Sequence, residues 1–308
     1  MTTGGKTIPG QAIIFACLFC IFGTAHAFAQ SRSITPSVPD YRQAAPVDQD
    51  KGRAILEAIR TSAIDGDFYF EFQLILRPKG TSTRTIIPGR MWGSRNERGP
   101  VTRITLRPGS QNDERDLLVQ SGPQSAVWTY SRNNNTNGGQ AGSASSAAAR
   151  LDPSAMFEPL AGTDLSAFEL QMPFIHWNDH TYEGLRSGNF RVTHAFLMRP
   201  PAEIANARPD LTGVRLYYDE GYRTITVFEI LGPGGAVKKT MRLKDFHKVS
   251  DMFFLRKAEL RNETTGNGTD FNVLLTGVKL DLPRDIFSPE KLSVSVEPPP
   301  LKTLWKSR

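Results

Sequence analysis

The chain has 308 residues, with 37 lysines and arginines against 31 acidic residues and a formal net charge of +6 at pH 7. This excess is mild and contains no basic block, so it carries no nucleic-acid-binding signature, although it permits attraction to anionic lipid surfaces. Both cysteines, Cys17 and Cys20, lie in an N-terminal apolar run, so the rest of the chain has no disulfide, thiolate metal site or cysteine nucleophile.

Residues 1–29 are predicted to be a secretory signal peptide. Lys6 precedes the apolar run Ala12–Phe22, and small residues at A-x-A spacing follow it. The run is too short to span a bilayer comfortably, since a transmembrane helix needs about 20 apolar residues. We therefore expect cleavage after Ala27 or Ala29, with an uncleaved anchor or a buried helix as the alternative.

Residues 30–47 are polar and rich in proline, which predicts a flexible linker. Asp48 and Asp50 then cap a helix predicted for Lys51–Ala63, because apolar residues recur there at helical spacing: Ala54, Ile55, Ala58 and Ile59. Such an amphipathic stripe normally packs against a core.

Strict alternation of apolar residues predicts a strand over Asp67–Leu76. One face of this strand carries Phe68, Phe70, Phe72 and Leu74. Four more short strands, separated by turns with glycine or proline, are predicted: Thr83–Trp92, Val101–Leu106, Arg115–Gln120 and Ala126–Ser131. Their close spacing indicates an antiparallel meander, not alternating βαβ units.

Residues 132–150 form a low-complexity loop of Asn, Gly, Ser and Ala. Beyond residue 180, further strands are predicted: Thr181–Ser187, Phe190–Met198, Val214–Tyr218, Thr224–Leu231, Val237–Phe246, Met252–Arg261 and Thr269–Leu280. An antiparallel sheet of that size must curl, and unless it closes, its concave apolar face needs a cover. We expect a mainly β fold, a large curved antiparallel sheet or half-open β-barrel with an N-terminal helix, as a single domain over residues 48–292.

The segment Leu160–Gly184 supplies the cover. Thr163 and Asp164 are good N-cap residues, and Pro173 must end any helix that they start. Large apolar residues crowd this short stretch: Leu165, Phe168, Leu170, Met172 and Phe174. The sequence therefore predicts a short helical lid over the open face of the sheet.

Residues 293–308 form a proline-rich basic tail. Its composition predicts a disordered end. The alternative is that Trp305, with Lys302, Lys306 and Arg308, contacts lipid headgroups.

Catalytic motifs are lacking in the sequence. It contains no G-x-S-x-G, G-x-G-x-x-G or P-loop. His176 and His180 form an H-x3-H pair, but Pro173 argues against the shared helix face that a metal pair needs. We therefore expect no enzyme activity, no cofactor and no metal, and keep a hydrolase using His176 or His180 as the weakest hypothesis.

An excess of large apolar side chains remains. An ordinary core accounts for about half of them by the usual burial of such residues. The functional alternative is a cavity whose aromatic and methionine lining tolerates acyl chains, with binding driven by roughly 0.8 kcal/mol per buried CH₂. The candidate residues for the acyl cavity and lid are Phe68, Phe70, Phe72, Leu74, Trp92, Phe168, Met172, Phe174 and Trp177.

The order of these parts resembles the LolA-like proteins, often labelled outer-membrane lipoprotein-sorting proteins. The resemblance covers about Asp50–Leu292, and its motifs are Gly162–Ser166, Glu169–Leu170, Phe174-x-x-Trp177 and Tyr182–Gly184. The later segments Val214–Tyr218, Val237–Lys239 and Thr269–Leu275 fit the same pattern. It implies a half-open barrel with a helical lid that carries acyl chains of lipoproteins without cofactor or covalent chemistry. Glu169 stands where the family usually has Asp.

The lid-latching arginine of the best-known LolA-like proteins has no recognisable counterpart, so Arg77, Arg84 and Arg90 stay unassigned. The resemblance implies a periplasmic carrier in outer-membrane lipoprotein sorting. The alternative is a periplasmic sensor or regulatory binding module on the same fold. The expected partners are lipoprotein acyl chains or other lipid, with transient contact to membrane-bound donor and acceptor proteins, no nucleic acid, and a monomeric state.

Overall fold

The structure, a computed structural model, describes residues 20–21, 46–62, 64, 66–109, 113–133, 147–188, 191–249 and 252–306. The predicted signal peptide and linker lie almost wholly outside the described residues, as does the centre of the low-complexity loop, so these remain predictions. None of the helices that the structure describes has the length and apolar character needed to cross a bilayer.

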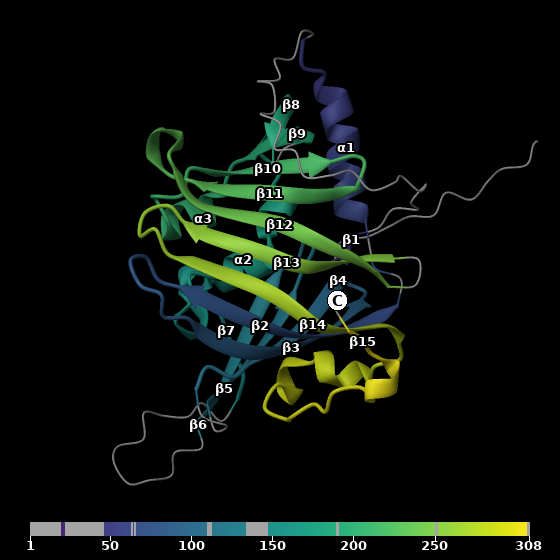
Figure 1. Ribbon diagram of the computed structural model, residues 1–308. Helices are drawn as coiled ribbons and strands as arrows, with labels where there is room; N and C mark the ends of the chain where they lie inside the picture. The colour runs from purple at the N-terminus through teal and green to yellow at the C-terminus, as the bar shows by residue number, and fades with distance from the viewer. Residues whose placement is uncertain are drawn as a thin grey trace, which may run out of the picture.

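One antiparallel sheet of 15 strands dominates the molecule (Figure 1). Its main path follows the order β7-β6-β5-β4-β3-β2-β14-β13-β12-β11-β10-β9-β8, and no pairing between the described parts of β7 and β8 closes it. The path strands are β2 (Asp67–Arg77), β3 (Thr85–Asn96), β4 (Gly99–Leu106), β5 (Asp113–Gln120), β6 (Ala126–Asn133), β7 (Ala149–Arg150), β8 (His180–Gly188), β9 (Arg191–Met198), β10 (Gly213–Asp219), β11 (Thr224–Leu231), β12 (Val237–Val249), β13 (Met252–Asn262) and β14 (Gly268–Leu280). The predicted mainly β, half-open fold is confirmed.

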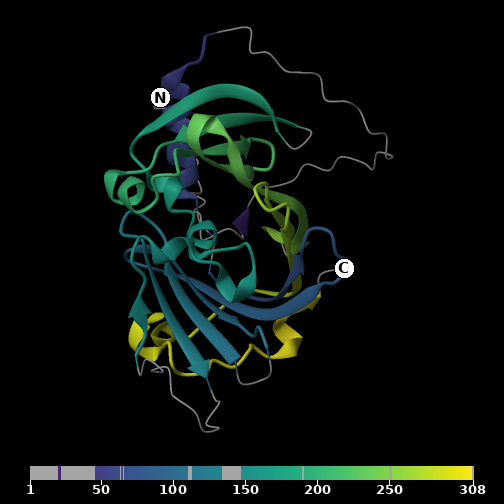
Figure 2. The same ribbon diagram turned by 90° about the vertical axis from the view of Figure 1, so that its left-hand side faces the viewer.

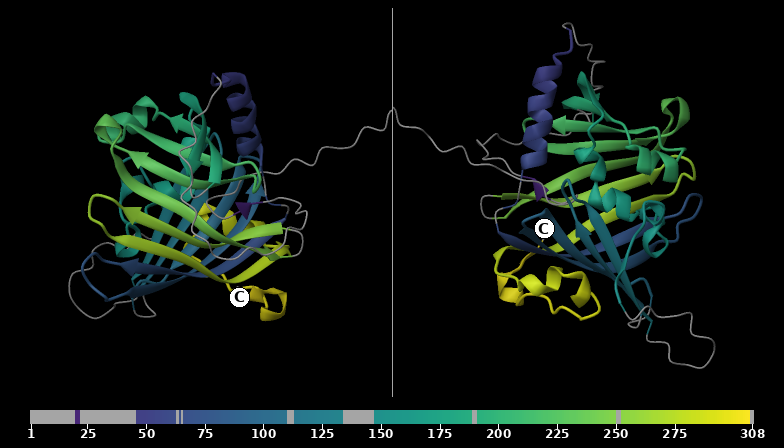
Figure 3. Two further views of the ribbon diagram at one scale, coloured as in Figure 1. Left: turned by 45° about the horizontal axis from the view of Figure 1, so that its top comes forward. Right: turned by 180° about the vertical axis from the view of Figure 1, so that it is seen from behind.

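The pairing of β2 with β14 joins the N-terminal and C-terminal groups of strands into one curved sheet (Figure 3). Two short strands lie off the main path: β1 (Cys20–Ile21) pairs with β13, and β15 (Trp305–Lys306) pairs with β14. Direct pairing of β13 with β14 extends only to Lys257 and Asn272. Beyond these residues the two long strands diverge, and we call this place the split of the sheet.

The helices are few and short. They comprise α1 (Gln49–Thr61), α2 (Ala167–Gln171) and α3 (Ala202–Ala207), with 3-10 turns η1 (Ala155–Phe157), η2 (Leu160–Gly162), η3 (Pro173–His176), η4 (Pro233–Gly235), η5 (Arg284–Phe287), η6 (Pro289–Lys291) and η7 (Leu301–Thr303). Helix α3 has no counterpart among the elements predicted from the sequence. The composition of the tail predicted a disordered end, and this was wrong for residues 293–306, because η7 and β15 hold them on the sheet.

Helix α1 begins at the predicted cap, since the Asp48 carboxylate accepts backbone hydrogen bonds from Asp50 and Lys51. Its buried face was only partly predicted. Ile59 is buried as expected, but Ala54 and Ala58 are exposed, and the other buried residues are Gly52 and Leu56. Gly52 lies so close to β8 that an added Cβ would come within 2.4 Å of the Tyr182 Cβ. The buried face of the helix therefore includes Gly52, a position that the spacing of apolar residues does not predict.

The outer face of the sheet is covered by residues 282–296, which we call the C-terminal cap. Leu282, Ile286, Phe287 and Leu292 pack on it as a second apolar cluster with Tyr69, Trp92, Val101 and Leu118. Figure 3 shows these C-terminal helices, in yellow, against the blue strands. The whole of β4 is buried as a result, since one face contacts the main core and the other the cap.

A buried arginine fastens this cap. The guanidinium of Arg103, which is 1% exposed, donates to the carbonyls of Ile286, Lys291, Leu292 and Val294 at 2.6–3.3 Å. Asp116 lies 3.7 Å away and also pairs with Arg132 at 2.8 Å. Burial lowers the pKa of Arg103 and raises that of Asp116, as expected when charged groups are taken out of water.

Candidate functional site

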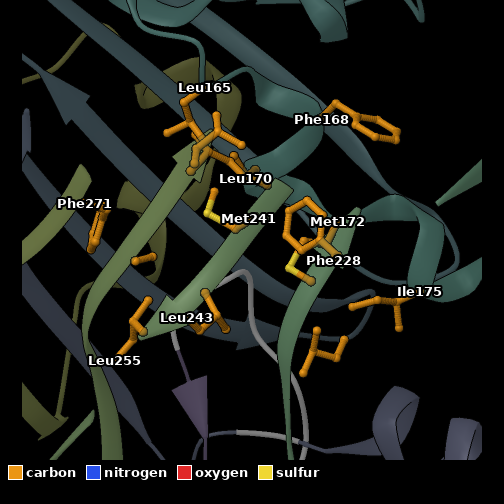
Figure 4. Packing of buried hydrophobic residues seen from close by; sticks show 14 of the residues in the cluster. Leu165, Phe168, Leu170, Met172, Ile175, Phe228, Met241, Leu243, Leu255 and Phe271 are labelled. Atoms are coloured by element: carbon orange, nitrogen blue, oxygen red, sulfur yellow. The ribbon is translucent and has the colours of Figure 1, made fainter. Parts of the chain in front are cut away.

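The main core lies on the concave face of the sheet, between the strands and residues 155–177, which we call the lid. Figure 2 shows the short lid helices, in teal, on this side. Figure 4 shows lid side chains such as Leu170 and Met172 beside Met241 and Phe228 of the sheet. The predicted helical cover is therefore present.

Helix α2 begins later than predicted. Its N-cap is Ser166, not Thr163 or Asp164, and the Ser166 backbone N–H donates to Glu169 Oε2 at 2.8 Å in a capping box. The helix ends at Met172, which adopts a left-handed conformation with φ of 52°, and Pro173 then opens η3. The break that Pro173 was expected to impose is confirmed.

Aromatic rings pack within the lid, and one of them also contacts the sheet. The Phe168 ring centroid lies 4.5 Å from Phe157, 5.5 Å from Phe174 and 6.1 Å from Trp177. Phe174 in turn lies 5.1 Å from Phe228 of β11. The contact of Phe174 with Phe228 is apolar, so it has no directional requirement and can be replaced by another apolar surface.

Opposite the lid is an apolar wall formed by Phe68, Phe70, Phe72, Leu74, Phe254 and Phe271, each at most 3% exposed. Phe72 stacks on Phe271 at 4.5 Å, and Phe70 lies 5.8 Å from Phe254. Two glycines of β3 make room for this packing. A Cβ on Gly93 would come 1.9 Å from the Phe68 ring, and one on Gly89 would come 2.3 Å from the Phe72 ring. The rings therefore extend sideways over β3.

Eight of the nine candidate residues belong to this core: Phe68, Phe70, Phe72, Leu74, Phe168, Met172, Phe174 and Trp177. The structure does not bring Trp92 together with them. Trp92 pairs across the strands with Tyr69 and lies in the outer cluster under the C-terminal cap. Period-two alternation explains this placement, because Met91 next to it faces the main core.

A lysine of β12 latches the lid. Lys239 Nζ donates to Glu169 Oε1 at 2.9 Å and to the Asp164 carbonyl at 2.8 Å. Glu169 is 1% exposed, so its charge is balanced within the protein mainly by this pair. The latch was missed from the sequence, although Lys239 belongs to one of the motifs that carry the resemblance. Arg77 instead pairs with Glu259 and Asp270.

Further polar contacts attach the lid before and after α2. Before α2, Asn262 Nδ2 donates to Asp164 Oδ1 at 2.7 Å. At the end of the lid, Arg60 of α1 donates to the carbonyls of Ile175 and Trp177 at 2.8 and 2.7 Å. A hollow of about 650 Å³ lies beside this end, between the β5–β6 turn and the start of α3. Beside its apolar packing, the lid is thus attached by hydrogen bonds from several separate side chains, including Gln171, whose Nε2 donates to the Gln120 carbonyl at 2.9 Å.

The two residues of the H-x3-H pair lie in different elements, because His176 ends η3 and His180 begins β8. Burial and the neighbouring Arg60 lower the pKa of His176 to about 4, so it is neutral near pH 7. His180 contacts the Asn178 carbonyl through Nδ1 at 2.8 Å. Among the described residues, no group of three or more His, Cys, Asp or Glu side chains is arranged to hold a metal ion.

Three solved structures with a similar fold are distant in sequence. A DUF1329 family protein from Desulfovibrio piger is 13% identical with a TM-score of 0.60, over 74% of this chain and 91% of that one. A putative outer membrane lipoprotein-sorting protein domain from Vibrio parahaemolyticus is 14% identical with the same TM-score and coverage. A LolA superfamily protein from Nitrosomonas europaea is 13% identical with a TM-score of 0.54, over 77% and 96%.

No protein-family model matches the sequence, and no curated protein matches it. At identities this low, the three structures establish the fold and nothing more. The chain therefore has a LolA-like fold, as its sequence motifs indicate.

Proposed function

We propose that this protein is a periplasmic carrier that holds acyl chains of lipoproteins or other lipids between the apolar wall and the lid. The proposal rests on one observation: the apolar wall faces a lid whose polar attachments are separate side-chain hydrogen bonds. The LolA-like fold and the predicted signal peptide support it. The expected absence of enzyme activity belongs to the same proposal.

The closed lid and a bound acyl chain compete for the same apolar surface. Lifting the lid separates Phe168, Met172 and Phe174 from the sheet, and an acyl chain then covers the wall in their place at about 0.8 kcal/mol per CH₂. Opening also returns Glu169 and Lys239 to water. Because a buried ion pair contributes little net stability, its rehydration costs little. The exchange therefore needs no covalent chemistry.

Displacement of a fluorescent fatty acid tests this function. Phe72→Asp and Phe174→Asp should each weaken binding at least about tenfold, because either places a charge in the apolar site. Ile86→Asp is the matched control, since Ile86 is 55% exposed on β3, and it should leave binding unchanged. No displacement from wild type at any acyl length would refute the carrier function. Release of the bound chain to acceptor vesicles distinguishes a carrier from a sensor.

A further inference from the structure

The last described residues of the chain form a fixed structure on the sheet. Thr303 and Leu304 donate backbone hydrogen bonds to Pro300 and Leu301 at 2.9 and 3.1 Å, which shapes η7. Leu304 packs over Gly277 of β14, where an added Cβ would come within 2.9 Å of it. Strand β15 follows at once. The tail therefore has a defined orientation relative to β14.

This fixed tail exposes large apolar side chains to water. Leu301 is 77% exposed and Trp305 is 54% exposed, and Leu301 is the most exposed of the large apolar residues in the described part of the chain. Lys302 and Lys306 are also exposed. No acidic residue occurs between Leu301 and Lys306. The tail thus combines an indole, a leucine and two cations on a short, ordered segment.

The tail also lies at the split of the sheet (Figure 1). Trp305 pairs with Thr276 of β14, and Thr276 pairs on its other side with Phe70 of β2. Directly paired residues of antiparallel strands project to the same face. Trp305 therefore projects from the concave side, the side of the apolar wall, beyond the point where β13 and β14 diverge.

We propose that residues Leu301–Lys306 dock the protein on an anionic bilayer surface. Trp and Leu side chains partition into the interfacial region of a bilayer, where the indole N–H stays hydrated. Lysines beside them are attracted by anionic headgroups. In this orientation the split of the sheet faces the bilayer, so the surface that gives or receives an acyl chain lies next to the proposed binding site.

A bilayer fits this surface better than a second protein does. A stable protein interface buries about 800 Å² on each partner around a continuous apolar centre. Two apolar side chains with two lysines supply much less than that. Interfacial insertion needs only a few such anchors, since anionic lipid adds the electrostatic attraction.

Sedimentation with lipid vesicles tests the proposal. The protein should bind vesicles of phosphatidylglycerol and phosphatidylethanolamine, and bind purely zwitterionic vesicles much more weakly. Lys302→Gln and Lys306→Gln should each weaken binding about fivefold. Leu301→Ser with Trp305→Ser should weaken it roughly tenfold or more. Ile86→Ser and Lys51→Gln, which remove an exposed apolar group and an exposed charge elsewhere, are the controls and should have no effect.

Brominated lipid gives a second readout that a structural role of the tail would not produce. It should quench part of the wild-type tryptophan fluorescence, and Trp305→Phe should remove that quenching. Failure of wild type to bind anionic vesicles, or equal binding by the tail variants, would overturn the proposal. The proposed docking explains how the carrier would reach a membrane, but vesicle binding itself does not depend on the carrier function. Displacement of a fluorescent fatty acid without vesicles reports the carrier function separately.

Discussion

The two faces of this sheet are covered in physically different ways. The lid on the concave face is latched by Lys239, with Asn262 and Arg60 adding separate hydrogen bonds. The cap on the outer face is held by Arg103, which donates to four backbone carbonyls from a fully buried position. The polar contacts of the lid come from separate side chains on β12, β13 and α1, whereas a single buried guanidinium joins four carbonyls of the cap. We therefore expect the lid to open more readily than the cap.

The largest expected effect comes from removing the cap fastening. Arg103→Met leaves four carbonyls and the buried Asp116 without this donor, which should cost roughly 3–5 kcal/mol of unfolding free energy. Urea denaturation measures the loss. Arg107→Met is the control, because Arg107 is 39% exposed and its pair with Glu114 should be worth less than about 1 kcal/mol. Equal losses of unfolding free energy in the two variants would show that Arg103 holds the cap no more strongly than an exposed ion pair does.

A smaller but more localised effect is expected for the lid. Lys239→Met leaves the buried Glu169 carboxylate without its cation, so the lid should open, since opening rehydrates that charge. Hydrogen exchange in residues 165–177 should rise, and the fatty-acid probe should bind faster. Adding Glu169→Met should reverse both effects. Lys238→Met, one residue away, is the control. Exchange and binding rates equal to wild type would show that Lys239 is not a latch.

The smallest effect is a pH dependence of the sheet itself. Burial alone would raise the pKa of Glu259, but hydrogen bonds from Lys244 and Arg77 outweigh it and lower the pKa to about 2. Because this lies below the ordinary value of 4.5, the stability from Glu259 is present above pH 4.5 and is lost as the pH falls towards 2. Thermal melting over this window should show a shallower acid decline in Glu259→Gln than in wild type. Parallel declines would contradict this assignment.

Local sequence rules predicted the strands well. Alternation placed Phe68, Phe70 and Phe72 on one face, and turn residues separated most strands near their observed ends. The same rule, applied strictly, would also have moved Trp92 to the outer face, since it follows Met91. The position of the lid was predictable because Pro173 and the crowded apolar residues leave little choice of structure.

The side-chain contacts that hold the lid and the C-terminal cap were not predictable, because they join residues that are remote in sequence. Lys239 is 70 residues from Glu169, and Arg103 is 183 to 191 residues from three of its carbonyl partners, Ile286, Leu292 and Val294. No local pattern distinguishes these side chains from surface charges. The ordered tail was missed for the same reason, since its structure depends on packing against Gly277 of β14.

Native mass spectrometry of the protein purified from its host tests the central claim most directly. The account predicts that wild type carries additional mass from an acyl lipid or lipopeptide, and that Phe72→Asp lacks it. Wild type and Phe72→Asp both at the mass of the bare chain would contradict the account.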